Sequence, residues 1–68
     1  MTYRSIALAS SAIAAIDYDD AEDPADLTIT FVNGQTYDYF AVPLAVIADF
    51  IAAASPGRFY HAQIKGLY

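Results

Sequence analysis

The sequence predicts an α+β fold in which a three-stranded antiparallel meander packs against two C-terminal helices. Three short runs of β-branched and aromatic residues, separated by turn residues, fill residues 12–40 and indicate the strands. Apolar residues then recur at helical spacing from Pro43 onward and indicate the helices. Because the chain has only 68 residues, we expect a single domain that covers residues 1–68.

The three predicted strands cover residues 12–18, 27–31 and 36–40. Asn33-Gly34 closes the hairpin between the second and the third strand. A two-residue loop would mix the apolar and polar faces of the sheet. A three-residue loop over residues 32–34 keeps the faces separate and favours a type I turn with Gly34 in the left-handed position of a bulge. This register pairs Ile29 with Tyr37, Leu27 with Tyr39 and Thr28 with Asp38.

The segment between the first two strands, residues 19–26, is acidic, contains Pro24 and shows no periodicity, so we expect an exposed loop. A calcium loop of the EF-hand type that began at Asp17 would need Gly at its sixth position and Glu at its twelfth. Glu22 and Thr28 stand there instead. We therefore interpret the segment as a solvated loop that helps to keep an apolar protein in solution, and we predict no metal site and no cofactor.

Pro43 is expected in the first turn of a helix that runs to about residue 54. The exposed face of this helix carries alanines and Asp49 alone, so it is either a lightly charged surface or a contact with another chain. Ser55 and Pro56 are typical of the N-cap and the first position of a second helix, which we expect over residues 57–65. The apolar face of the first helix comprises Leu44, Val46, Ile47, Phe50 and Ile51.

The composition narrows the class of function. Eight Asp or Glu oppose three Lys or Arg, and the net charge of −5 disfavours binding to duplex nucleic acid. The lack of Cys excludes disulfides and thiolate metal sites. With 57% hydrophobic residues, so short a chain predicts a homo-oligomer. No apolar run could span a membrane, and a leader cleaved near residue 16 would cut into a predicted strand, so we expect a cytoplasmic protein without membrane contact.

Positive charge is concentrated near the C-terminus. Arg58, His61 and Lys65 lie at positions i, i+3 and i+7 and share one face of the last predicted helix. Ser55 and the first amides of that helix lie nearby, so this face could hold a phosphate or a carboxylate. The alternative is that the basic side chains form ordinary surface ion pairs with Asp49 or with the acidic loop.

Tyr60 and Tyr68 lie near this basic face and offer rings that could stack on a nucleotide base. The alternative for the tyrosines is packing in the core or in an interface. Likewise, His61 is either part of a site or a polar side chain at the surface. We predict no catalytic residues, because the chain shows no nucleophile turn, no Cys to pair with the His, and no cofactor motif.

A series of residues stands in a characteristic order along the chain: Ser10, Ser11, Ile13, Ile16, Tyr18, Leu27, Phe31, Gly34, Tyr37, Tyr39, Val42, Pro43, Ala54, Ser55, Gly57, Phe59, Tyr60, Ile64 and Tyr68. This series resembles the KTSC domain, a small module named for its place at the C-terminus of some lysyl-tRNA synthetase-like proteins. The resemblance runs from Ser10 to Tyr68, and its most specific parts are Tyr-x-Tyr-x-x-Val-Pro and Ala-Ser-x-Gly. It implies a compact α+β unit with a short antiparallel sheet covered by helices, and it implies no established activity. Two positions depart from the family: His61 stands where Asn is frequent, and Lys65 where Arg is usual, which keeps the charge without the bidentate geometry.

These observations favour a non-catalytic module that captures an anionic, nucleotide-type ligand, as a homo-oligomer whose pockets lie between subunits. The predicted ligand-binding residues are Arg58, His61, Lys65, Tyr60, Tyr68 and Ser55. As stand-alone members of the family occur in phages, such a module could sequester a nucleotide signal and act as an anti-defence protein. The alternative is an accessory domain that interacts with RNA or with a protein.

Overall fold

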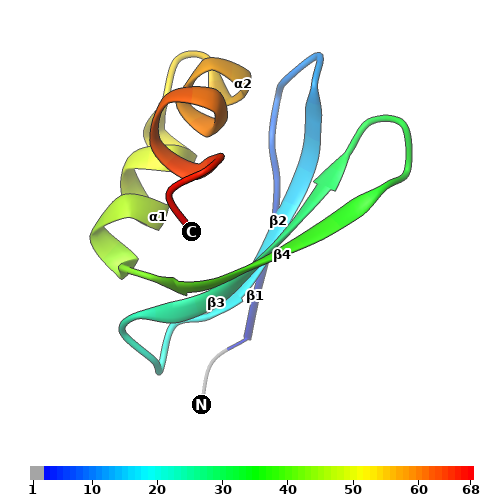
Figure 1. The fold of residues 1–68 in the computed structure, drawn as a ribbon. Coiled ribbons are helices and arrows are strands. Elements are labelled where there is room, and N and C mark those ends of the chain that lie inside the picture. The colour runs from blue at the N-terminus through cyan, green and yellow to red at the C-terminus, as the bar shows by residue number, and fades with distance from the viewer. Residues whose placement is uncertain (1–2) are drawn as a thin grey trace.

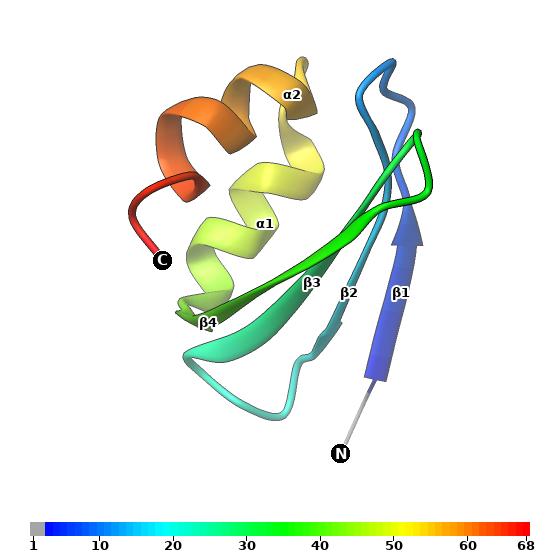
Figure 2. The same ribbon diagram turned by 45° about the vertical axis from the view of Figure 1, so that its right-hand side comes forward.

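The computed structural model describes residues 3–68 and shows an α+β fold (Figure 1). Four antiparallel strands form one sheet in the order β1-β2-β3-β4, so each strand lies beside its neighbours in sequence. The helical segments follow the last strand and cover one face of the sheet (Figure 2). The elements are β1 (Tyr3–Ala7), β2 (Ile13–Asp19), β3 (Ala25–Phe31), β4 (Thr36–Val42), α1 (Leu44–Ala52), α2 (Pro56–Phe59) and η1 (Tyr60–Ile64).

The prediction of three strands was wrong, because β1 pairs with β2 and extends the sheet to four. Within β1 only Ile6 is partly buried, where it lies opposite Ile16. Arg4 forms an exposed ion pair of 2.8 Å with Asp20, just after β2. A strand with one half-buried side chain shows little of the apolar alternation by which strands are recognised in sequence.

The predicted register of the β3–β4 hairpin is confirmed. Ile29 pairs with Tyr37, Leu27 with Tyr39 and Thr28 with Asp38. Thr28 Oγ1 donates a hydrogen bond of 2.7 Å to Asp38 Oδ1 on the outer face. At the turn, the Gly34 N–H donates to the Phe31 carbonyl at 2.9 Å, and Gly34 has the left-handed φ of 89° that the bulge requires. This register turns Tyr37 and Tyr39 toward the helical layer.

Helix α1 begins at Leu44, and Pro43 occupies the N-cap position rather than the first turn. Pro43 has no side chain that can cap, and the acidic β2–β3 loop supplies the cap instead. Asp23 Oδ1 accepts a hydrogen bond of 3.0 Å from the Leu44 N–H, and the Asp23–Pro24 peptide is cis. The predicted apolar face packs inward with Ile47 and Phe50 fully buried, and α1 ends at Ala52, two residues earlier than expected.

The core lies between the sheet and the helices. It joins side chains from β2, β3, the end of β4, α1 and the terminal helical segment, and no polar side chain is buried within residues 3–68. The buried apolar residues are Ile13, Ile16, Ala25, Leu27, Ile29, Val42, Ile47, Phe50, Tyr60 and Ile64.

The last predicted helix is present in two parts. Pro56 is its first residue and Ser55 sits at the N-cap, as expected, although the Ser55 side chain makes no capping hydrogen bond. After Phe59 the helix widens into η1, a π-helical turn in which the Lys65 N–H donates to the Tyr60 carbonyl at 2.8 Å. The predicted helix over residues 57–65 is therefore present, and its second half is π-helical instead of α-helical.

Candidate functional site

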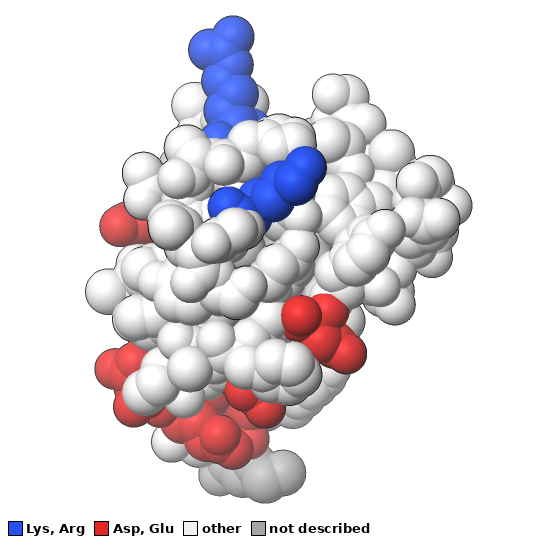
Figure 3. Space-filling view, in the orientation of Figure 1, with Lys and Arg blue, Asp and Glu red and all other residues white. Residues whose placement is uncertain are grey.

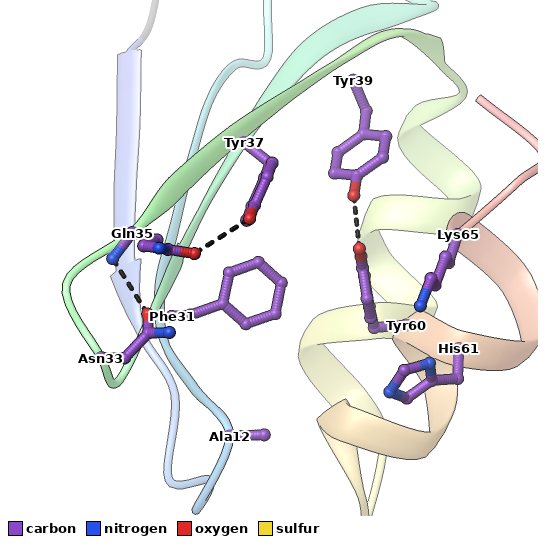
Figure 4. A pocket seen from close by; sticks show the side chains of 9 residues that line it. All are labelled: Ala12, Phe31, Asn33, Gln35, Tyr37, Tyr39, Tyr60, His61 and Lys65. Carbon is purple, nitrogen blue, oxygen red and sulfur yellow. Dashed lines mark hydrogen bonds between the residues drawn. The ribbon is translucent and has the colours of Figure 1, made fainter.

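A pocket of about 540 Å³ opens between the β3–β4 hairpin and the terminal helical segment. Figure 4 shows two sides: the β3–β4 hairpin supplies the side chains on one, and η1 with the residue after it supplies those on the other, while Ala12, just before β2, completes the lining. The volume lies in the range of small-molecule pockets. The lining residues are Ala12, Phe31, Asn33, Gln35, Tyr37, Tyr39, Tyr60, His61 and Lys65.

Aromatic rings form the walls of the pocket. Phe31 contacts Tyr37 and Tyr60 with ring centroids 5.5 Å and 5.2 Å apart, and Tyr60 contacts Tyr39 at 5.9 Å. All three contacts are edge-to-face, with interplanar angles of 79°, 77° and 70°. The rings therefore offer surfaces of different orientation to a ligand instead of closing into a parallel stack.

The hydroxyls of Tyr39 and Tyr60 hydrogen-bond to each other across the pocket floor (Figure 4). Burial, followed by the hydrogen bond with Tyr60, raises the pKa of Tyr39 to about 12. This pair ties β4 to η1, because one residue stands on each element. The raised pKa keeps the Tyr39 phenol in its neutral form over the physiological pH range.

Polar side chains of the hairpin tip stand on the strand side of the pocket. Asn33 Oδ1 accepts a hydrogen bond of 3.0 Å from the Gln35 backbone N–H, which is an Asx turn. Gln35 Oε1 accepts one of 2.9 Å from the Tyr37 hydroxyl. Both amide oxygens are therefore engaged within the hairpin, as the dashed lines in Figure 4 indicate.

His61 and Lys65 stand on the helical side of the pocket. The π-helical turn explains how Lys65 reaches it. In an α-helix the residue five positions after Tyr60 points well away from it, since a turn takes 3.6 residues. In η1 the i→i+5 hydrogen bond closes a wider turn, so Lys65 returns to the side of Tyr60.

The sequence spacing had predicted one helical face for Arg58, His61 and Lys65, and the pocket lining includes two of these three residues. Of the six residues predicted to bind ligand, Tyr60, His61 and Lys65 line the pocket, whereas Arg58, Ser55 and Tyr68 do not. Within residues 3–68, neither Arg58 nor Lys65 forms an ion pair. The alternative of pairing with Asp49 or with the acidic loop is thus not what this structure shows.

Sequence reasoning missed Phe31, Asn33 and Gln35 as lining residues and left Tyr37 and Tyr39 unassigned between core and groove. The register of the hairpin could have identified the aromatic lining residues. Because side chains alternate between the two faces of a strand, this register puts Phe31, Tyr37 and Tyr39 on the same, helix-facing side of the sheet. No comparable signal points to Ala12, which precedes β2.

The charges are distributed unevenly over the molecule. In the view of Figure 3, the visible Lys and Arg atoms lie over the upper, helical part of the molecule. Most of the visible Asp and Glu atoms lie at the opposite end. No Asp or Glu lines the pocket. Within residues 3–68, no group of three or more His, Asp or Glu side chains is arranged to hold a metal ion, and no helix has the length and apolar character needed to cross a bilayer.

The family model of the KTSC domain matches residues 9–68. The chain belongs to the KTSC domain family. A protein of Tsukamurella paurometabola is 46% identical over 56 residues, which span 82% of this chain and 81% of that protein. The crystal structure of a KTSC domain protein from Yersinia pestis superposes with a TM-score of 0.85 at 35% identity, and the match covers 97% of this chain and 90% of the other.

Two much longer proteins contain a related segment. Lysine–tRNA ligases of Trichormus variabilis and of a Nostoc species are each 43% identical over 42 residues. The match spans 62% of this chain and only 8% of each ligase. The resemblance to the KTSC domain inferred from sequence is therefore confirmed. Sequences similar to this chain occur both as small proteins and as segments of ligases.

Proposed function

We propose that this KTSC domain is a non-catalytic binding module that captures a small, anionic, nucleotide-type ligand in the pocket between the hairpin and η1. The observation that carries the proposal is the composition of the pocket: four aromatic rings stand beside Lys65 and His61, and no carboxylate lines it. A nucleotide joins a flat apolar ring to a negative phosphate, and the pocket offers a complement to each.

The base would lie against the ring walls. Aromatic side chains bind bases through their π-faces, and every base has such a face. Tyr37, which is 48% exposed, presents the most accessible ring of the pocket, while Tyr60 is nearly buried and acts as the floor.

The phosphate would lie at the helical side. Lys65 forms no ion pair within the described part of the chain, so its ammonium is available as a point charge for phosphate. His61 lines the same side and contacts the Tyr60 ring edge-on at 5.3 Å. On a protein of net charge −5, a carboxylate-free pocket with a free cation is where an anion meets the least repulsion.

Capture without turnover suits a module of this kind. This part of the proposal is supported by the sequence, which shows no nucleophile turn, no Cys to pair with His61 and no cofactor motif. In this proposal the protein acts in the cytoplasm by sequestering a nucleotide signal, in the manner of a phage anti-defence protein. The proposal includes homo-oligomerisation, which is supported by the small core and by the large apolar side chains left at the surface.

A second candidate is an accessory domain that interacts with RNA or with a protein. Its specific support is the related segment in the two lysine–tRNA ligases. The net charge of −5 argues against the RNA version. A gel shift with tRNA at low salt tests it: a salt-sensitive shift supports an RNA-binding role, and the lack of any shift removes it.

Lys65 and Arg58 provide a matched pair of variants for the main proposal. We expect Lys65→Glu to weaken binding of nucleoside monophosphates by about tenfold or more, because a charged hydrogen bond is lost and a repulsion is gained. Arg58→Glu makes the same change of charge outside the pocket and should leave binding within about twofold. Isothermal titration with a panel of nucleoside monophosphates measures both affinities.

Native mass spectrometry of protein purified from cells, compared with refolded protein, shows in parallel whether a ligand is carried along. Reproducible extra mass that Lys65→Glu removes and Arg58→Glu retains would support capture at the pocket. Equal loss of affinity in both variants, or in neither, would contradict it.

A further inference from the structure

The hairpin side of the pocket is rich in hydrogen-bond donors. The Asn33 carboxamide is oriented by the Gln35 backbone N–H, which can only donate, so Asn33 Oδ1 must face it. The Asn33 amino group is thereby left without a partner within the hairpin. The orientation follows from the hydrogen bond, and Figure 4 shows this amino group on the pocket side of the turn.

Gln35 repeats this arrangement. Its Oε1 accepts from the Tyr37 hydroxyl at 2.9 Å, which uses the single proton of that phenol and leaves the Gln35 amino group free. The two hydroxyls of Tyr39 and Tyr60 are paired with each other. With Lys65 on the opposite side, the polar groups still available are mostly donors, and the lining includes no carboxylate to balance them.

We propose that the pocket selects nucleotides with a keto base, such as guanine, hypoxanthine or uracil, over those with an amino base, through the amino groups of Asn33 and Gln35. This inference rests on the proposed function. Guanine offers O6 and N7 as acceptors and uracil offers O4, whereas adenine and cytosine place an amino donor at the corresponding position. A donor facing the Asn33 and Gln35 amino groups would leave polar groups unpaired, which costs affinity.

The layout of the pocket makes this selection possible in one binding mode. The two amides lie at the hairpin tip and Lys65 on the helical side, with the Phe31 and Tyr60 rings between them (Figure 4). A base placed against these rings can therefore direct one edge to the amides while its phosphate reaches Lys65.

Inosine and adenosine monophosphates test the selection, because inosine has the keto group where adenosine has the amino group. We expect the inosine compound to bind about tenfold more tightly, the size expected for one good base-edge contact. Asn33→Asp and Gln35→Glu keep the oxygen that holds the hairpin together and replace only the free amino group. Each should lower the affinity ratio to about one or below, because a carboxylate oxygen accepts from the adenine amino group and repels the inosine keto oxygen.

The added charge of these variants repels the phosphates of both nucleotides alike, so the ratio of the two affinities reports the contact with the base. Gln63→Glu adds the same charge on η1 at an exposed residue outside the pocket, and it should preserve the ratio. If adenosine monophosphate binds as tightly as inosine monophosphate, or if neither hairpin variant changes the ratio, the selection is refuted while nucleotide capture stands. If neither nucleotide binds, both the selection and the proposed function are refuted.

Discussion

Gly34 has a φ angle of 89°, a left-handed conformation that residues with a Cβ atom rarely adopt. A Cβ added there would meet no atom within 4 Å, so the cost of Gly34→Ala is backbone strain alone. We expect the variant to lower the free energy of unfolding by about 1 kcal/mol. Urea denaturation measures the change.

Gly57 provides a control for which the expected change in the free energy of unfolding has the opposite sign. It lies in α2, and its added Cβ would make an ordinary contact of 3.5 Å with Ala12. Gly57→Ala should therefore stabilise the protein by about 0.5 kcal/mol. Equal stability of the Gly34→Ala variant and the wild type would show that the turn does not need the left-handed residue.

Tyr39 links stability to alkaline pH. Its pKa is raised to about 12 in the folded protein, mainly by burial and the hydrogen bond with Tyr60, while a free phenol titrates at about 10. The folded state thus binds this proton more tightly, so its contribution to stability is complete below about pH 10 and is lost as the pH rises toward about 12. The free energy of unfolding, measured by urea titration across this range, should fall more steeply for the wild type than for Tyr39→Phe. Identical slopes would contradict the assignment to Tyr39.

At the scale of elements, the acidic β2–β3 loop has a structural task besides solubility. Asp23 caps α1 across the sheet edge, where Pro43 cannot. We expect Asp23→Ala to lower the free energy of unfolding by about 1 kcal/mol, the usual cost of a lost helix cap. Asp23→Asn keeps an acceptor and should cost less, and Asp26→Ala, at an exposed residue of β3, should change stability by less than about 0.5 kcal/mol. Chemical denaturation compares the three variants, and a loss as large for Asp26→Ala would mean that the loop acts through its charge alone.

Elements whose shape depends on neighbouring residues could be predicted from sequence, and those that depend on distant contacts could not. The hairpin register follows from Asn33-Gly34 and the alternation on either side, which are local signals. The π-helical turn has no comparable signal, because Tyr60 and Ile64 would suit an α-helix equally well. Its place is fixed by tertiary contacts, since both side chains are buried against the sheet. For the same reason, α-helical spacing could not predict that Lys65 lines the pocket while Arg58 does not.

At the scale of the whole molecule, the missed element is the edge strand β1. Ile6 is the partly buried residue of this strand, and it lies opposite Ile16 on the neighbouring strand. The local sequence around Ile6 does not show this pairing. The family match begins at residue 9, after β1, whereas the likeness to the Yersinia protein covers 97% of the chain. None of the pocket residues comes from β1, so the error in strand number did not affect the site.

At the scale of the whole molecule, the surface predicts that copies of the chain associate with one another. Large apolar side chains remain exposed, among them Phe40, which is 66% exposed on the edge strand β4 and points away from the helices. Each copy carries a net charge of −5, so copies repel one another, and salt screens this repulsion. We therefore expect a homo-oligomer whose association strengthens with salt, the opposite of the salt response expected for phosphate at Lys65.

Sedimentation velocity at low and high salt measures this association, and nucleotide titration under the same conditions measures the second response. Phe40→Ser should weaken association by about tenfold if this side chain is central to the contact. It should leave the affinity for nucleotide unchanged if each pocket is complete within one chain, and lower it if the pocket is completed by a second copy. A mass of one chain at every salt concentration would contradict the oligomer, and it would require the exposed apolar side chains to serve a different partner.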